Sequence, residues 1–131
     1  MIELRRFPPH PVRGVRIYKV SRGCGPFIDV TLDFEPADEG FEFEVQDGIL
    51  ADWEWPEDLP RFFSALARGV REELGHEAYR MAVAVRAVLR AARAHPIDSG
   101  EFSFYAGGER AAREAVARAF GEPPRAEEWT D

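Results

Sequence analysis

The feature that most constrains the fold is a strict alternation of apolar and polar side chains. Between residues 28 and 35 every second side chain is apolar, and most of those between are acidic. The apolar members are Ile28, Val30, Leu32 and Phe34, and the polar members are Asp29, Thr31, Asp33 and Glu35. A period of two residues predicts a β-strand with one buried and one solvated face. Residues 41–45 repeat the pattern after a turn-rich stretch, so the two runs predict an antiparallel hairpin, and residues 15–18 predict a third, weaker strand.

Two other segments have helical spacing. In residues 59–74 apolar side chains recur every three or four positions, Asp58 is the expected N-cap, and Gly75 follows as a stop signal. A second helix is expected over roughly residues 108–120, with an apolar face made of Ala112, Ala115, Val116, Ala119 and Phe120. Residues 79–94 are ambiguous, because their alanine and arginine content favours a helix whereas their alternation favours a strand.

Charge is unevenly distributed along the chain, which has a net charge of −7. Residues 28–60 contain twelve acidic side chains and no lysine or arginine, while residues 1–22 and 61–95 are basic. Two interpretations are open. Acidic and basic strands can pair on a solvated sheet face. Alternatively, the basic segments can meet in space and form a surface that attracts an anionic partner such as RNA.

The remaining composition narrows the class of protein. A chain of 131 residues is long enough for one hydrophobic core, and it contains no apolar run near the roughly 20 residues that span a bilayer. The N-terminus has no secretory signal pattern and Cys24 is the only cysteine, so we expect a cytoplasmic protein without an internal disulfide. No histidine spacing predicts a metal site, no P-loop motif is present, and no cofactor is expected.

Five short segments carry a resemblance to a known family. They are S-R-G-C-G-P-F-I-D-V-T-L-D-F-E-P at 21–36, F-E-F at 41–43, P-E-D-L-P at 56–60, A-L-A-R-G-V-R-E-E-L at 65–74 and H-P-I-D-S-G-E-F-S-F at 95–104. In this order they resemble the fourth domain of the ribosomal translocase elongation factor G. The resemblance covers roughly residues 20–120, which is nearly all of the expected globular part.

The resemblance implies an α+β fold in two layers, a β-sheet covered by two helices, with a left-handed β-α-β crossover. It makes residues 80–93 a strand, and it places the loops at 21–26 and 94–99 together at one tip. We expect residues 1–121 to form this single domain and residues 122–131 to be a loosely ordered acidic tail.

In the family, the tip enters the decoding region of the small ribosomal subunit and contacts RNA. Carried over by position, the residues that the resemblance implies for RNA binding are Ser21, Arg22, Gly23, Arg90, Arg93, His95, Asp98 and Ser99. Arg86 lies on the strand that leads into the tip, and Arg16 and Lys19 are expected to approach it from the first strand. In the alternative interpretation, His95 is an ordinary solvated loop residue and Asp98 or Ser99 caps the following segment.

The function implied by the resemblance is a non-enzymatic module that binds ribosomal RNA or the small subunit. Because the chain has no P-loop, GTP binding is not expected. A protein-interaction or regulatory module is the alternative function, and it would use the acidic hairpin at 28–47 or the aromatic pair Trp53 and Trp55. Trp-Glu-Trp alternation puts both rings on one face, so we expect them to be buried.

Overall fold

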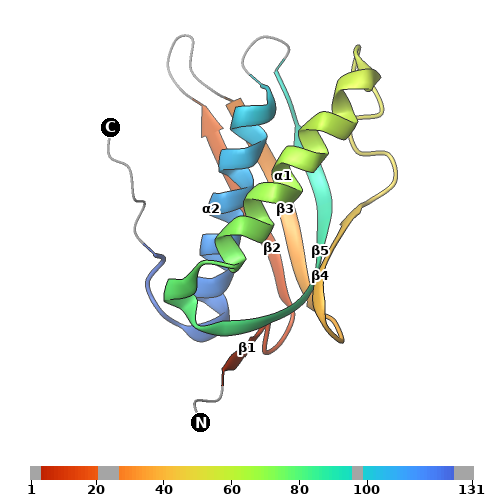
Figure 1. Ribbon diagram of the computed structural model, residues 1–131. Helices are drawn as coiled ribbons and strands as arrows, with labels where there is room; N and C mark the ends of the chain where they lie inside the picture. Colours follow the sequence, from red (N-terminus) through yellow and green to blue (C-terminus); the bar gives the residue numbers. More distant parts are fainter. Residues whose placement is uncertain (1–3, 21–26, 96–98, 126–131) are drawn as a thin grey trace.

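The structure, a computed structural model, describes residues 4–20, 27–95 and 99–125. In chain order its elements are β1 (Arg5–Phe7), β2 (Val12–Val20), β3 (Phe27–Pro36), β4 (Gly40–Val45), α1 (Leu59–Leu74), β5 (Met81–Arg93) and α2 (Glu101–Phe120), with short 3₁₀ turns at Pro56–Asp58 and Glu77–Tyr79. The strands form one sheet in the order β1-β5-β3-β2, and β4 also pairs with β5. Both helices lie against the same face of this sheet (Figure 1). The predicted two-layer α+β fold is therefore confirmed.

The strand β5 occupies the centre of the sheet, and this placement corrects one prediction. It runs antiparallel to β3 and parallel to β4, so that Val85 pairs with Pro36 on one side and with Phe41 on the other. The strands β3 and β4 therefore do not form the predicted hairpin, because β5 lies between them. Val85, Val88 and Leu89 are fully buried, and a strand that is apolar on both faces is most stable in the middle of a sheet. The ambiguous segment is thus a strand, and β4, α1 and β5 form a parallel crossover.

The core lies between the sheet and the pair of helices. The alternate residues Val30, Leu32 and Phe34 of β3 are fully buried there, as their period of two predicts. Phe62 of α1 stacks on Phe104 of α2, with ring centroids 5.0 Å apart and an angle of 8° between the ring planes. The apolar stripes of both helices are consequently buried against each other and against the sheet.

The helix α1 has the predicted bounds, but its start differs from expectation. Asp58 makes no capping hydrogen bond, and its carboxylate instead accepts a hydrogen bond of 3.0 Å from Arg61. At the other end, Gly75 stops the helix and donates its N–H to the carbonyl of Arg71. Within the described residues, neither helix is long and apolar enough to cross a membrane.

The helix α2 begins at Glu101, about two turns before the start predicted from sequence. Two consecutive glycines, Gly107 and Gly108, weaken the helical pattern, which is why the prediction began only at the second of them. In the structure they allow a close helix crossing. A Cβ atom on Gly108 would lie 2.2 Å from the carbonyl oxygen of Leu66, and one on Gly69 would lie 2.1 Å from that of Tyr105. These glycines therefore bring the two helix backbones together.

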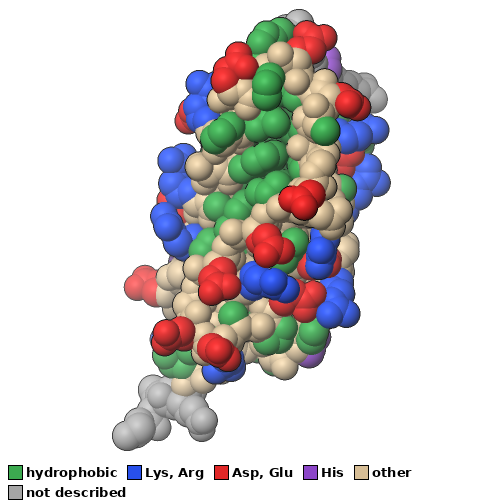
Figure 2. Space-filling view, turned by 90° about the vertical axis from the view of Figure 1, so that its right-hand side faces the viewer, with side chains coloured by type: hydrophobic (Ala, Val, Ile, Leu, Met, Phe, Trp, Pro, Cys, Tyr) green, Lys and Arg blue, Asp and Glu red, His purple; other side chains and the backbone are tan. Residues whose placement is uncertain are grey.

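One side of the molecule carries a stripe of hydrophobic side chains. Figure 2 shows it on the side where α1 and β4 lie, bordered by charged groups. The inward residues of β4, namely Phe41, Phe43 and Val45, are only half-buried. Trp53 packs against the core with its ring 6.4 Å from that of Phe62, whereas Trp55 is 40% exposed. The expected burial of the aromatic pair is therefore incomplete.

The chain after α2 is tied to the body by two charged contacts. Arg5 donates hydrogen bonds of 3.1 and 3.0 Å to the two carboxylate oxygens of Glu122. Arg125 donates hydrogen bonds of 2.9 and 2.8 Å to the buried carboxylate of Glu73 in α1. The described part of the C-terminal segment thus packs on the domain, and the boundary at residue 121 stays a prediction.

Candidate nucleic-acid interface

The strands β2 and β5 end, and the strand β3 begins, at the same end of the sheet (Figure 1). The register pairs Val20 with Phe27 and Asp29 with Arg93. Of the residues expected to bind RNA, Ser21, Arg22, Gly23 and Asp98 lie outside the described residues, as does Cys24. The described side chains that gather at this end on the sheet face away from the helices form the tip cluster: Arg16, Tyr18, Phe27, Asp29, Arg93 and His95.

Three rings lie in a row in the tip cluster. The ring of Tyr18 meets that of Phe27 edge-on, with centroids 6.2 Å apart and an interplanar angle of 84°. The ring of Phe27 lies 6.3 Å from that of His95. Tyr18 is 55% exposed, His95 is exposed and Phe27 is half-buried. These separations fall in the range of favourable aromatic pairs, so the rings support one another while one side stays open to solvent.

Sequence reasoning identified His95 but missed Tyr18 and Phe27. The alternation of side chains along β2 and β3 nevertheless indicates that these two rings lie on the solvated face. Phe27 is in phase with Asp29, and Tyr18 is in phase with Arg16, so both rings project from the polar face of their strands. Neighbouring large apolar side chains on a solvated face are characteristic of a contact surface.

One buried carboxylate organises the tip cluster. The side chain of Asp29 is 8% exposed, and it accepts two hydrogen bonds of 3.0 Å from Arg16 while Arg93 Nε lies 3.1 Å from one of its oxygens. The guanidinium of Arg16 lies 5.1 Å from the ring centre of Tyr18, and that of Arg93 lies 5.9 Å from the ring centre of Phe27. The hydrogen bonds and the charge of Asp29 raise the pKa of Arg16. Because a single carboxylate holds two guanidiniums, the tip cluster keeps a net positive charge.

Ser99 links the end of β5 to β3. Its Oγ accepts a hydrogen bond of 2.8 Å from the N–H of His95 and donates one of 3.1 Å to the carbonyl of Phe27. Its own N–H donates to the carbonyl of His95 at 3.0 Å. Ser99 therefore joins His95 to the start of β3 and fixes the position of His95, which is a structural role close to the capping role of the alternative interpretation.

Away from the tip cluster, the charges of the open sheet face pair across strands. The pairs are Arg90 with Asp33 at 2.8 Å, Arg13 with Glu35 at 2.8 Å and Arg86 with Glu44 at 3.6 Å. Arg86 and Arg90 thus lie along the middle of the sheet beside carboxylates and do not join the tip cluster. The interpretation in which acidic and basic strands pair is confirmed for the described side chains of this face, and among them positive charge is in excess at the tip cluster.

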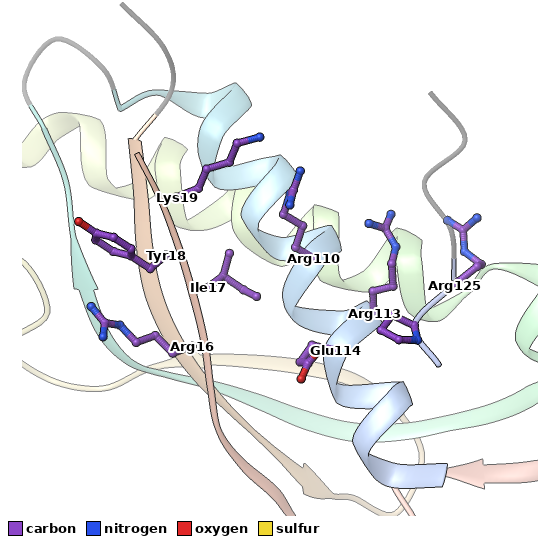
Figure 3. Close-up of a pocket in the computed structure, with 9 residues that line it drawn as sticks. Arg16, Ile17, Tyr18, Lys19, Arg110, Arg113, Glu114 and Arg125 are labelled. Carbon is purple, nitrogen blue, oxygen red and sulfur yellow. The ribbon is translucent and has the colours of Figure 1, made fainter. Parts of the chain in front are cut away.

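Lys19 does not join the tip cluster, although we expected it to approach the tip from the first strand. Its register partner, Ile28, faces the core, so Lys19 leaves β2 on the helix side and extends beside Arg110 (Figure 3). As for metals, the described ranges 4–20, 27–95 and 99–125 contain no group of three or more His, Cys, Asp or Glu side chains that could hold an ion. The tip cluster therefore offers rings and guanidiniums, which suit bases and phosphates.

Comparison with known proteins identifies relatives among translation factors. No protein-family model matches the chain. It is 33% identical over 106 residues to an elongation factor G-like protein of Mycobacterium tuberculosis, a match that covers 78% of this chain and 14% of the relative. It is 31% identical over 107 residues to elongation factor G of Dehalococcoides mccartyi, covering 79% of this chain and 15% of that protein. The chain thus spans about one seventh of the length of these curated relatives.

A solved structure has the same fold. A crystal structure from Thermus thermophilus superposes with a TM-score of 0.58 and 24% sequence identity, over 83% of this chain and 16% of that chain. The sequence relatives carry the family assignment, and the structural match supports the arrangement of sheet and helices. Together they identify the chain as a homologue of elongation factor G that corresponds to one domain of that factor, the fourth.

Proposed function

We propose that the chain is a non-enzymatic module that binds RNA of the small ribosomal subunit through the tip cluster. The observation that carries this proposal is the set of rings and guanidiniums held at the end of the sheet. Exposed bases stack on tyrosine, histidine and arginine planes, and guanidiniums bind phosphates. Tyr18 is 55% exposed, so its ring is accessible to a base.

Preorganisation makes this small surface effective. Asp29 holds Arg16 and Arg93 against the rings, so few side-chain rotamers remain to be lost on binding. A base stacked on an aromatic side chain contributes about 1–3 kcal/mol. Two stacked bases would together contribute about 2–6 kcal/mol, and two nearby cations would add contacts to phosphates. Because the two guanidiniums of the tip cluster can each neutralise a phosphate, we expect the affinity to fall with rising salt, with a slope of about 1.4 on logarithmic axes for a single strand.

The test is co-sedimentation with small ribosomal subunits, together with fluorescence anisotropy on a labelled single-stranded RNA. We expect Tyr18→Ala and His95→Ala each to weaken binding by about tenfold, as the loss of one stacking platform implies. Arg16→Gln supplies a charge variant with a matched control. Arg13 lies on the same strand and makes the same two-point contact with a carboxylate of β3, but it lies three residues further from the end of the strand and outside the tip cluster.

The control decides the outcome. If Arg16→Gln weakens RNA binding while Arg13→Gln does not, binding depends on position at the tip and not on total charge. Equal effects of the two substitutions, or binding unchanged by Tyr18→Ala and His95→Ala, would refute the tip cluster as the RNA site. Circular dichroism of each variant verifies that the fold is retained.

A protein-interaction role is the second candidate, and the hydrophobic stripe in Figure 2 favours it. Within the described residues, β4 pairs with β5 alone and leaves its other edge open, beside the half-buried side chains of Phe41 and Phe43. Such an edge is suited to a partner strand. Ribosome binding that survives the tip variants but is lost in Phe43→Glu would indicate that this side, and not the tip cluster, makes the contact.

A further inference from the structure

The strand β4 has one backbone edge without a partner. In a strand, the N–H and C=O groups of successive residues point to opposite edges. Gln46 directly follows β4 and donates its N–H to the carbonyl of Leu89 in β5. The backbone groups of Glu42 and Glu44 have the same phase, so they also point toward β5. The residues between and beside them point the other way, and these are Phe41, Phe43 and Val45.

The described part of the chain leaves this edge uncovered. Among residues 4–20, 27–95 and 99–125, β4 pairs with β5 alone, and no other backbone hydrogen bond reaches its outward groups. Figure 1 shows β4 at the margin of the sheet, with the connection to α1 leading away from its end. A row of unpaired N–H and C=O groups is a template for pairing with another chain.

The two faces of this edge differ in chemistry. The apolar side chains of β4 pack against the core but are only half-buried, on the side where Figure 2 shows the hydrophobic stripe. On the opposite face Glu42 and Glu44 are exposed. Glu44 lies 3.6 Å from Arg86, whereas Glu42 has no ion pair among the described residues. The connection at 46–58 adds further acidic side chains and no lysine or arginine. The edge therefore presents an apolar row beside an acidic row.

We infer that the open edge of β4 binds an extended segment of a partner protein in which basic side chains alternate with apolar ones. The six residues of β4 offer about 20 Å of edge. Main-chain hydrogen bonds would supply affinity, and the two side-chain rows would supply specificity. Opposite charges and apolar pairs across neighbouring strands both stabilise a sheet. This inference rests on the second candidate role, to which it gives a partner of defined chemistry, and is independent of the tip cluster.

The charge of β4 disfavours a second copy of the chain as the partner. Antiparallel pairing of two β4 strands that keeps their apolar rows on one face places glutamate opposite glutamate, which is destabilising. A shift of one residue brings the apolar row of the second copy onto the acidic face instead. Charged side chains protect many natural edges from self-association in this way. A basic segment converts the same repulsion into attraction.

The test uses the whole chain and a fluorescein-labelled peptide that alternates arginine with valine. A length of about eight residues is that of an ordinary strand. Binding is measured by anisotropy, and amide hydrogen exchange locates it. We expect the peptide to slow exchange at Phe41, Phe43 and Val45, whose N–H groups face the open edge, and to leave Glu42 and Glu44 unchanged. A peptide with glutamate in place of arginine should not bind.

A matched pair of variants tests the acidic row. The edge variant is Glu42→Gln with Glu44→Gln, and the control is Glu77→Gln with Glu101→Gln. Each pair joins one exposed glutamate without an ion pair among the described residues to one that has a cation, Arg61 at 3.0 Å from Glu101 in the control. Both variants lose the same charge. We expect the edge variant to bind the peptide about fivefold more weakly than the control, with circular dichroism verifying both folds.

N-methylation of the peptide tests whether its backbone pairs with β4. One form is methylated at every valine nitrogen and the other at every arginine nitrogen. Only one edge of an added strand faces β4, so one form should lose binding while the other keeps it. Loss in the valine form indicates antiparallel pairing, because each valine opposite an outward residue of β4 then exchanges hydrogen bonds with it. Loss in the arginine form indicates parallel pairing.

Three results would overturn the inference: equal binding of the two methylated forms, unchanged exchange at the outward amides, or equal loss in the edge and control variants. It is also overturned if these amides are protected in the chain alone while sedimentation shows a dimer, since the occupant is then a second copy. Peptide binding that persists in Tyr18→Ala supports the edge whether or not the chain binds RNA. The failure of the tip cluster is therefore distinguishable from the failure of the edge.

Discussion

The close crossing of α1 and α2 provides a quantitative test of the fold. A Cβ atom at Gly108 would lie 2.2 Å from the carbonyl oxygen of Leu66 and 3.0 Å from the backbone nitrogen of Val70. A carbon and an oxygen that are not bonded need more than about 3 Å between them. In a Gly108→Ala variant the helices must therefore separate by roughly 1 Å, because backbone atoms cannot change rotamer.

The cost follows from the contacts that this separation loosens. Leu66 and Val70 are fully buried at the crossing, and the stacked rings of Phe62 and Phe104 lie one turn away. A gap of about 0.5–1 Å forfeits about a quarter to a half of the dispersion energy of a contact, and overpacking a core costs about 1–3 kcal/mol. Replacing glycine by alanine in a helix gives back about 1 kcal/mol. Because the obstacle is a backbone atom, we take the upper end of the overpacking cost. We therefore expect Gly108→Ala to lower the free energy of unfolding by about 2 kcal/mol.

The adjacent glycine is a matched control. A Cβ atom at Gly107 would lie 2.7 Å from Cγ1 of Ile28, a buried side chain, and alanine there gains the same helix propensity. We expect Gly107→Ala to cost less than Gly108→Ala, because a side chain can shift slightly whereas the carbonyl of a neighbouring helix backbone cannot. Urea and thermal unfolding followed by circular dichroism measure both variants, and about 2 kcal/mol corresponds to roughly 8 °C in Tm for a chain of this size. Equal stability of the two variants would refute the crossing geometry.

Three further predictions concern ionisable groups. Burial raises the pKa of Glu73, but hydrogen bonding and the charges of Arg113 and Arg125 outweigh it, so the folded-state pKa lies below the ordinary 4.5. Its stabilisation is therefore present above pH 4.5 and is lost as the pH falls through the folded-state pKa, and Glu73→Gln should flatten the acid limb of a stability–pH curve. Arg125→Ala should cost about 2 kcal/mol in urea unfolding, because it removes one of two cations from a buried carboxylate, and it should speed amide exchange in the C-terminal segment. The hydrogen bond to Glu72 and burial raise the pKa of Tyr105 to about 12, so Tyr105→Phe should remove an ultraviolet tyrosinate step at that pH.

Local pattern determined much of the secondary structure. The alternation of residues 28–35 predicts β3 and its buried face, and the spacing of residues 59–74 predicts α1, because both patterns arise from the period of a single element. The strand at 81–93 could not be assigned this way, since its residues satisfy both periods. Only the ordered resemblance to a family distinguished them.

The sequence pattern did not predict which strands and helices pack against each other. The separation of β3 from β4 depends on β5 entering between them from much further along the chain, and no local signal encodes such a pairing. The crossing at Gly108 was not predicted for the same reason, because glycine weakens an isolated helix and its role here is a close contact with α1. The start of α2 was consequently predicted too late.

For the functional surfaces, too, residue order determined one part and tertiary structure decided the other. By itself the sequence determined that basic and acidic segments alternate along the chain, since this is a property of residue order. Which charges cancel was decided by tertiary structure, because it places Asp33 beside Arg90 and Asp29 between Arg16 and Arg93. Electrostatic interactions decay with distance in space and not along the chain, so only the folded molecule shows where positive charge remains in excess.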